Sequence, residues 1–146
     1  MLKQIDFHDN EHVLRLFLSV FTQEPWNDRW ESDRYAMAYI ADLMDNQNSL
    51  CFGWYRDDRL IGLALGHTYH WWQGKEYFIK EFCIAREEQG KGQGKQFLGS
   101  IEEYVKFLSI SCLWLSTDRD VPAYAFYKAS GYIEQKQSVM FAKRIL

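Results

Sequence analysis

Hydrophobic and polar positions along the chain follow two different periods, which alternate from segment to segment. Apolar residues recur every three or four positions in residues 11–21, 32–44, 96–108 and 122–130, which predicts four helices. Alternating or continuous apolar runs predict strands in residues 2–7, 49–56, 59–69, 77–84 and 113–115, with one or two closing strands in residues 133–145. The resulting order, β-α-α-β-β-β-α-β-α-β-β, predicts an α/β (mixed α+β) fold in which helices cover both faces of a mixed sheet.

Turn-forming residues separate these segments. Pro25 disfavours helical backbone at the preceding residue, so the first helix is expected to end just before it. Asp57 and Asp58 join two strands as a hairpin, and Gly131 ends the last helix. No linker, repeat or low-complexity segment interrupts the pattern, and 146 residues suit one core. We therefore expect a single domain over residues 1–146.

Composition narrows the class of protein. Apolar residues make up 47% of the chain and charged residues 25%, which is ordinary for a globular protein. The net charge of −3 argues against a general nucleic-acid binder, and no apolar run is long enough to span a bilayer. The three cysteines sit singly in apolar runs, as buried free thiols of a reducing compartment do. We expect a cytoplasmic protein with no membrane partner and no metal, since His67 and His70 alone are too few ligands.

Residues 89–95, Gln-Gly-Lys-Gly-Gln-Gly-Lys, lie between an apolar strand and an amphipathic helix. Glycine lets backbone N–H groups approach a ligand closely, and a following helix directs its free N–H groups and dipole at the same point. This context favours a phosphate-binding loop over a flexible surface turn. The nucleotide-binding patterns fail, because Gln96 stands where a P-loop needs Ser or Thr. Lys95 or Phe97 stands where a dinucleotide fingerprint needs its third glycine.

Two motifs, in this order along the chain, resemble those of the GCN5-related N-acetyltransferase (GNAT) family. The first is Gln-x-x-Gly-x-Gly, carried by Gln89, Gly92 and Gly94. The second resembles the family's Asn-x-x-Ala-x-x-Phe-Tyr-x-Lys-x-Gly-Phe, with matches at Ala123, Phe126, Tyr127 and Gly131 and with Asp120, Ala129 and Tyr132 as departures. The resemblance covers nearly the whole chain. It implies a mostly antiparallel sheet and the use of acetyl-coenzyme A (acetyl-CoA) as cosubstrate.

The resemblance also implies which residues bind acetyl-CoA. Backbone N–H groups of residues 89–94 would hold the pyrophosphate, while Lys91 or Lys95 would either add charge or be merely solvated. The strand before the loop would splay from its neighbour, so that its backbone pairs with the pantetheine arm and polarises the thioester carbonyl. The residues so implied are Phe82, Cys83, Ile84, Gln89, Gly90, Lys91, Gly92, Gln93, Gly94, Lys95, Asp120, Ala123, Phe126 and Tyr127.

Acyl transfer to an amine also needs an acid and a base. Tyr127 occupies the family's general-acid position, where a protonated phenol delivers a proton to the leaving thiolate. The alternative is that Tyr127 only packs against coenzyme A or hydrogen-bonds to it. Glu81, on the strand before the loop, is the candidate general base, and the alternative is an ordinary surface or ion-paired glutamate. Asp118 and Asp120 are the next candidates for the base.

The loop between the first two helices is expected to line the acceptor site. Trp26 and Trp30 offer flat aromatic surface, and Glu24 and Asp28 attract a cation. A core or dimer-contact role for both tryptophans is the alternative. Asp118 completes the substrate-binding candidates.

The hypothesis from sequence is acetyl transfer from acetyl-CoA to a primary amine of a small molecule or peptide, by direct attack on the thioester. One alternative is an acyl-CoA-binding regulatory or sensor module with little catalysis. Another is a nucleotide-binding domain, which the failed loop patterns weaken. The resemblance also allows a homodimer that uses the closing strands as contact edges.

Overall fold

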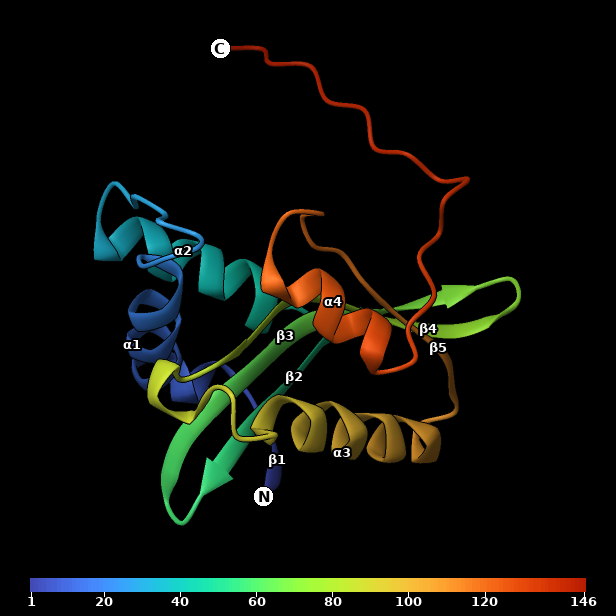
Figure 1. Ribbon diagram of the computed structural model, residues 1–146, viewed down its shortest axis with the longest axis horizontal. Coiled ribbons are helices and arrows are strands. Elements are labelled where there is room, and N and C mark those ends of the chain that lie inside the picture. The colour runs from blue at the N-terminus through green and yellow to red at the C-terminus, as the bar shows by residue number, and fades with distance from the viewer. The chain divides into compact units, whose positions relative to one another are not determined.

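A sheet of five strands in the order β1-β2-β3-β4-β5 forms the centre of residues 1–116 (Figure 1). The strands are β1 (Leu2–Ile5), β2 (Ser49–Arg56), β3 (Arg59–Trp71), β4 (Gly74–Ile84) and β5 (Ile110–Leu115). Neighbouring strands are antiparallel except β4 and β5, which are parallel. This confirms the predicted mixed and mostly antiparallel sheet. The computed structural model describes all of residues 1–146, and residues 117–146 form a second unit.

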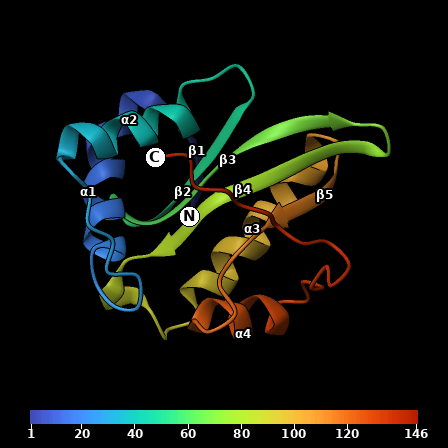
Figure 2. The same ribbon diagram turned by 90° about the horizontal axis from the view of Figure 1, so that it is seen from above.

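Helices cover both faces of this sheet, as predicted (Figure 2). Helices α1 (Asn10–Phe21) and α2 (Asp33–Met44) pack on one face, and α3 (Gln93–Phe107) packs on the other. Two neighbouring residues of β2 illustrate the division. The Cys51 thiol lies 3.6 Å from the carbonyl oxygen of Leu43 on α2, whereas the Phe52 ring lies 5.2 Å from Tyr104 on α3. Successive side chains of a strand point to opposite faces, so one strand serves both layers.

The first two helices form where their apolar stripes and caps predict them. Helix α1 buries five side chains at helical spacing, namely Val13, Leu16, Phe17, Val20 and Phe21. Helix α2 begins after Ser32, whose hydroxyl accepts a hydrogen bond from the backbone N–H of Tyr35 at 3.0 Å. Short 3-10 turns, η1 (Phe7–Asp9) and η2 (Arg86–Glu88), precede α1 and the glycine-rich loop.

Helix α3 begins three residues earlier than predicted, at Gln93 rather than Gln96. Gly92 is its N-cap residue and has a φ of 78°, a left-handed conformation that glycine adopts at little cost. The apolar stripe of α3 starts only at Phe97, which is why the hydrophobic period did not reveal the first turn. Residues 93–95 of the predicted loop are therefore the first turn of a helix.

The hairpin of β3 and β4 is longer than predicted. β3 continues to Trp71 and β4 begins at Gly74, so residues expected in a turn are paired in strands. Gly74 has a φ of 136°, and a Cβ atom there would lie 2.5 Å from the Ser111 hydroxyl oxygen. Trp71 and Trp72 lie exposed at the tip of the hairpin.

The three cysteines are free thiols, as predicted. Cys51 and Cys83 are buried, and Cys112 is half-buried. Burial raises the pKa of the Cys51 thiol to about 11 and also raises the pKa of Cys83, so both stay protonated at neutral pH. No helix has both the length and the apolar character that crossing a membrane requires.

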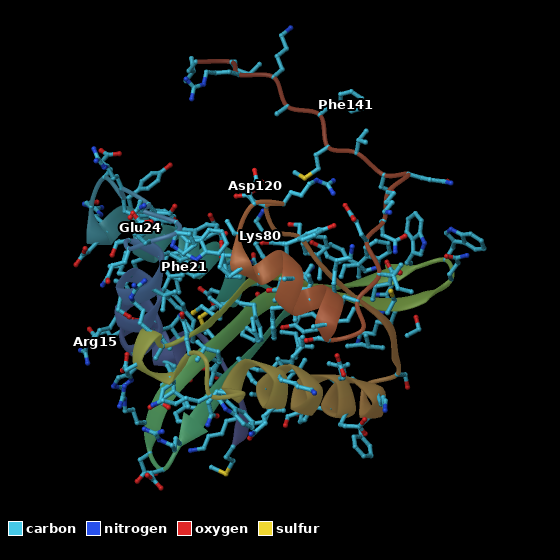
Figure 3. All side chains as sticks on the ribbon, in the orientation of Figure 1. Arg15, Phe21, Glu24, Lys80, Asp120 and Phe141 are labelled. Carbon is cyan, nitrogen blue, oxygen red and sulfur yellow. The ribbon has the colours of Figure 1, made fainter.

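The second unit, residues 117–146, contains one helix, α4 (Pro122–Ala129). The helix ends at Ala129, two residues before the predicted Gly131. Gly131 has a φ of 90°, and the N–H of Tyr132 after it donates a hydrogen bond to the carbonyl of Tyr127. The predicted closing strands in residues 133–145 are wrong, because residues 133–146 form no strand. Apolar residues favour a strand only where a ladder pairs their backbone. Here Val139, Met140 and Phe141 stay exposed on an extended segment (Figure 3).

Candidate active site

Strand β4 carries a bulge at Lys80. Its register against β3 shifts between Ile79 and Glu81, so that Lys80 has no residue opposite it. One extra residue reverses the face to which each following side chain points. Ile79 and Phe82 therefore share the α3 face, where the Phe82 ring stacks on Phe97 at 5.2 Å. Glu81 points to the opposite face, the one that α1 and α2 cover.

Gly66 of β3 makes room for this bulge. A Cβ atom at residue 66 would lie 2.0 Å from the carbonyl oxygen of Phe78 and 2.9 Å from the Cα of Ile79. Both contacts are with backbone, which cannot turn aside as the end of a side chain does. β3 and β4 thus approach so closely beside the bulge that residue 66 must be glycine.

Glu81 meets Tyr39 of α2 on this face. The Tyr39 hydroxyl donates a hydrogen bond to Glu81 Oε1 at 2.5 Å. Burial raises the pKa of the Glu81 carboxyl above its ordinary value, while the Tyr39 hydrogen bond and the charge of Lys80 oppose the rise and that of Asp28 adds to it. Burial and the bond to Glu81 raise the pKa of Tyr39, so its hydroxyl stays a donor. A carboxylate with a raised pKa is a better proton acceptor than an ordinary glutamate.

The edge of β4 that faces β5 is open beyond Ile79. The parallel pairing of β4 with β5 ends at Ile79 and Leu115, whereas β4 continues to Ile84 (Figure 2). Residues 81–84 are paired with β3 on one side only, and the bulged Lys80 has no partner on either strand. The pairing of β4 with β5 ends where β5 itself ends, at Leu115, so the predicted splay of the two strands stays a prediction. The side chains of Cys83 and Ile84 are buried, so these two residues offer a ligand only their backbone.

The glycine-rich loop presents backbone rather than side chains. Gly90 and Gly92 have φ values of 74° and 78°, and a Cβ atom at either would meet nothing within 4 Å. The first hydrogen bond within α3 is donated by Gln96 to Gly92 at 3.2 Å, so the N–H groups of residues 93–95 have no partner inside the helix. The first turn has no acidic residue, and Lys91 and Lys95 are exposed. These features suit an anion.

Two glutamines of the loop use their side chains to hold it in place. The Gln89 amide donates to the carbonyl oxygen of Ile84 at 2.9 Å and so ties the loop to the end of β4. The Gln93 amide oxygen accepts from Trp54 Nε1 of β2 at 2.7 Å. Both residues were predicted to bind the cofactor, and their side chains are directed to the protein.

The loop between α1 and α2 is folded back on the end of α1. The N–H of Asp28 donates to the carbonyl of Phe21 at 2.8 Å, and that of Trp26 donates to Gln23 at 3.0 Å. Arg86 of η2 donates from Nη1 to the carbonyl oxygen of Glu24 at 2.7 Å. Phe21 and Glu24 lie at this end of α1 (Figure 3). The loop is thereby tied to the segment that leads into the glycine-rich loop.

The two tryptophans of this loop have different surroundings. The Trp26 ring packs 5.7 Å from Phe21, which belongs to the core of α1. The Trp30 ring stacks on Tyr39 at 5.4 Å with an interplanar angle of 29° and also contacts Phe17 and Tyr35. Its Nε1 is buried without a hydrogen-bond partner. Trp30 thus stands beside the tyrosine that holds Glu81, whereas Trp26 packs on α1.

Asp28 completes this group, since its charge acts on both Tyr39 and Glu81. Partial burial raises the pKa of Asp28 as well. The structure therefore brings together Glu81, Asp28 and Trp30, which the sequence placed in distant segments. Glu24, also predicted to line the acceptor site, is exposed.

The second unit holds the remaining predicted residues. On α4 the Tyr127 ring lies 5.3 Å from Phe126 and 6.1 Å from Tyr132. Ala123 is half-buried on the same helix, and Asp118 and Asp120 are exposed in the segment before it. Hydrogen bonds from Tyr124 and Arg119 lower the pKa of Glu134 in this unit.

Sequence reasoning missed Tyr39, Gly66 and the bulge at Lys80. Tyr39 falls within the predicted helix of residues 32–44, and a phenol on the buried face of a helix needs a hydrogen-bond partner. Gly66 in a strand was itself a signal, because glycine within a strand often marks a bulge or a close backbone approach.

A family model described as the acetyltransferase (GNAT) family matches residues 11–132, which include parts of both units. No curated protein matches the chain. The match supports the resemblance seen in the two motifs.

Solved structures share the fold along almost the full chain. An aminoglycoside acetyltransferase from an uncultured soil metagenomic sample, in complex with sisomicin, has a TM-score of 0.77 at 15% identity and covers 100% of this chain and 96% of its own. The aminoglycoside N-acetyltransferase AAC(6')-Iy, in complex with CoA, has a TM-score of 0.74 at 16% identity, covering 99% and 95%. A ribosomal-protein-alanine N-acetyltransferase from Brucella melitensis biovar Abortus 2308 has a TM-score of 0.78 at 15% identity, covering 99% and 98%. At these identities the similarity shows the fold alone.

Proposed function

Because the chain belongs to the GNAT family of acetyltransferases, we propose that it transfers an acetyl group from acetyl-CoA to a primary amine of a small molecule or peptide. The observation that carries this proposal is the position of Glu81. The bulge turns its carboxylate onto Tyr39, and its backbone lies in the part of β4 that β5 does not pair. A proton acceptor beside an unpaired strand edge is what attack by an amine on a bound thioester requires.

The donor would be held by main chain. The N–H groups around Gly90, Gly92 and the first turn of α3 would bind the pyrophosphate, with Lys91 or Lys95 adding positive charge. The free N–H and C=O groups of residues 80–84 would pair with the pantetheine arm and orient the thioester. Hydrogen bonds from this edge would stabilise negative charge on the carbonyl oxygen during attack.

The acceptor would bind as a cation before it reacts. Asp28 and Glu81 supply negative charge, and Trp30 stacked on Tyr39 supplies an aromatic surface. The negative charge of Asp42 also raises the pKa of Tyr39. We therefore propose an acceptor that carries more than one ammonium group. Two of the similar structures are of aminoglycoside acetyltransferases, which supports amino sugars as the first compounds to test.

The reaction would proceed in a single addition and elimination at the thioester. Glu81 takes a proton from the ammonium, and the resulting amine nitrogen forms a bond to the carbonyl carbon. The carbon–sulfur bond would then break, the Tyr127 hydroxyl would donate its proton to the departing thiolate, and the nitrogen would lose its second proton to water, which leaves a neutral amide. The products are the acetylated amine and free CoA.

A panel of amines tests the proposal. Diamines, polyamines, amino sugars and peptides with a free N-terminal amine are each mixed with acetyl-CoA, and thiol release is measured together with the mass of the product. We expect turnover with at least one compound that carries two or more ammonium groups. Thiol release without an acetylated amine would contradict transfer. Tight binding of CoA with no turnover on any amine would favour the sensor module, and binding of ATP in place of CoA would favour a nucleotide-binding domain.

A further inference from the structure

Glu88 is the one charged residue of the chain that is buried, with 1% of its surface exposed. It is the last residue of η2 and lies immediately before Gln89, where the glycine-rich loop begins. Removing an ionised carboxylate from water is unfavourable by several kcal/mol unless ionic and hydrogen-bond partners replace the water. The Glu88 carboxylate therefore needs partners within the protein in place of water.

Arg56, the last residue of β2, supplies most of that replacement. Its Nη1 donates to Glu88 Oε2 at 2.7 Å, and its Nη2 pairs with Oε1, so guanidinium and carboxylate meet as a two-pronged pair. The Lys91 ammonium lies 3.8 Å from Oε2, which is within ionic contact but too long for a hydrogen bond. Glu88 thus joins the end of β2 to a residue of the loop.

The loop needs such an anchor because its glycines are not held by packing. Nothing lies within 4 Å of the Cβ positions of Gly90 and Gly92, and both have left-handed backbone. Glycine in an open loop has many accessible conformations, and fixing them on binding costs affinity. The loop is held instead at its two ends, by Gln89 and Glu88 on one side and by Gln93 on the other.

We propose that Glu88 is a positioning residue for the diphosphate of the donor, an inference that rests on the proposed use of acetyl-CoA. Paired with Arg56, it fixes the start of the loop and so the position of the Gly90 and Lys91 N–H groups, which, unlike those of Glu88 and Gln89, make no hydrogen bond within the preceding turn. Because Arg56 already neutralises the carboxylate, Lys91 is only loosely held by Glu88 and is available to the diphosphate. Loss of the Glu88 charge should therefore weaken the hold on the diphosphate and leave the chemistry at the thioester intact.

The adjacent residue provides a matched control. Glu87 is exposed and pairs with Arg59, another arginine of the β2–β3 hairpin region, on the surface. Glu87→Gln removes the same charge from the same turn, one residue away, without touching a buried pair. Exposed pairs contribute little to stability, so this variant reports the effect of net charge alone.

The experiment compares Glu88→Gln with Glu87→Gln on two donors, acetyl-CoA and S-acetylpantetheine, which has the same thioester but no diphosphate. For Glu88→Gln we expect the KM for acetyl-CoA to rise about tenfold, with kcat and the kcat/KM for S-acetylpantetheine within about twofold of wild type. Glu87→Gln should stay within about twofold on both donors. Equal losses on both donors, or no change with acetyl-CoA, would overturn the proposal.

A second variant covers the case in which Glu88→Gln folds poorly. Arg56→Lys keeps the positive charge but loses the two-pronged geometry, and it should raise the KM for acetyl-CoA by a smaller factor, about threefold. Calorimetry with CoA and with pantetheine gives the same contrast without turnover. If the wild type binds CoA but acetylates nothing, the selective loss of CoA affinity in Glu88→Gln still tests the role of Glu88 separately from the proposed reaction.

Discussion

The glycine-rich loop and the loop between α1 and α2, the two proposed binding regions, differ in the groups that they present. The first presents backbone, with Gly90 and Gly92 in left-handed conformations and no side chain above them. The second presents side chains, with the Trp30 ring stacked on Tyr39 and the charge of Asp28 close by. A diphosphate is the same in every molecule of the donor, so fixed N–H groups suit it. The acceptor side is where side-chain chemistry distinguishes one amine from another.

Glu81 belongs to both regions by its position on β4. Its backbone lies on the open edge that would align the donor, and its side chain lies against α2 on the acceptor side. The bulge at Lys80 makes this possible, because without it Glu81 would share the α3 face with Ile79. The reacting groups would therefore meet at Glu81.

The largest expected effect comes from Glu81→Gln, which should abolish the proton transfer and leave the binding of the donor unchanged. Gln has the same shape and still accepts the Tyr39 hydrogen bond, but its amide is not a base. We expect kcat to fall by about 100-fold or more, with an unchanged Kd for CoA by calorimetry. Glu76→Gln, on the same face of β4, is the control and should keep wild-type kcat. A Glu81→Gln enzyme with normal kcat would remove Glu81 from the chemistry.

The same variant should be more stable than wild type at neutral pH. Burial raises the pKa of Glu81, so the native state holds this proton more tightly than the unfolded state does. The ionised carboxylate therefore lowers stability at pH values above its native pKa, and Gln removes that effect. Thermal unfolding at neutral and acidic pH should show a gain in Tm for the variant that shrinks as the pH falls. A loss of stability at neutral pH would contradict the unfavourable burial of this charge.

Gly66→Ala is expected to have the next largest effect, through the bulge that links the two regions. The added methyl group would meet the Phe78 carbonyl and force the strands apart, which costs about 1–3 kcal/mol of unfolding free energy. A displaced Glu81 should also lower kcat by about tenfold. Gly99→Ala in α3 is the control, since its Cβ meets nothing within 4 Å, and it should add about 0.5–1 kcal/mol. Denaturant unfolding measures the loss of stability, and initial rates measure the fall in kcat. A Gly66→Ala protein with wild-type stability would show that the bulge tolerates a side chain.

Arg86→Met should have the smallest effect and act on the acceptor side alone. It removes the hydrogen bond to the Glu24 carbonyl that ties the acceptor loop to η2. An exposed bond of this kind contributes about 1 kcal/mol, so we expect the KM for the amine to rise about threefold, with an unchanged KM for acetyl-CoA. Arg59→Met, which breaks only a surface pair, should change neither value. A rise confined to the KM for acetyl-CoA would instead assign Arg86 to the donor side.

The sequence was sufficient for the features that depend on neighbouring residues. The apolar periods located all four helices and the five strands of the sheet, and Ser32 and Gly131 marked helix ends through local hydrogen bonds. The glycine pattern predicted a loop of exposed backbone before α3, because backbone conformation at Gly90 and Gly92 is a local property. The closing strands in residues 133–145 were a wrong prediction, because pairing is not a local property.

The features that escaped sequence reasoning depend on partners far along the chain. The bulge at Lys80 exists only against Gly66 on another strand, and the partner of Glu81 comes from α2. The burial of Glu88 depends on Arg56, thirty-two residues away along the chain. Nothing in the residues next to Glu81 or Glu88 distinguishes them from the exposed glutamates of the same segment. Burial and the register of pairing make the difference.

The most direct test of the central claim is the pH dependence of kcat/KM in wild type, Tyr39→Phe and Glu81→Gln. The Tyr39 hydrogen bond lowers the pKa of Glu81 against the rise caused by burial, so its removal should raise that pKa further. In wild type we expect kcat/KM to rise with pH as Glu81 loses its proton, above the ordinary glutamate pKa of about 4.3. This limb should move to higher pH in Tyr39→Phe and disappear in Glu81→Gln. An identical limb in all three proteins would contradict the assignment of Glu81 as the base.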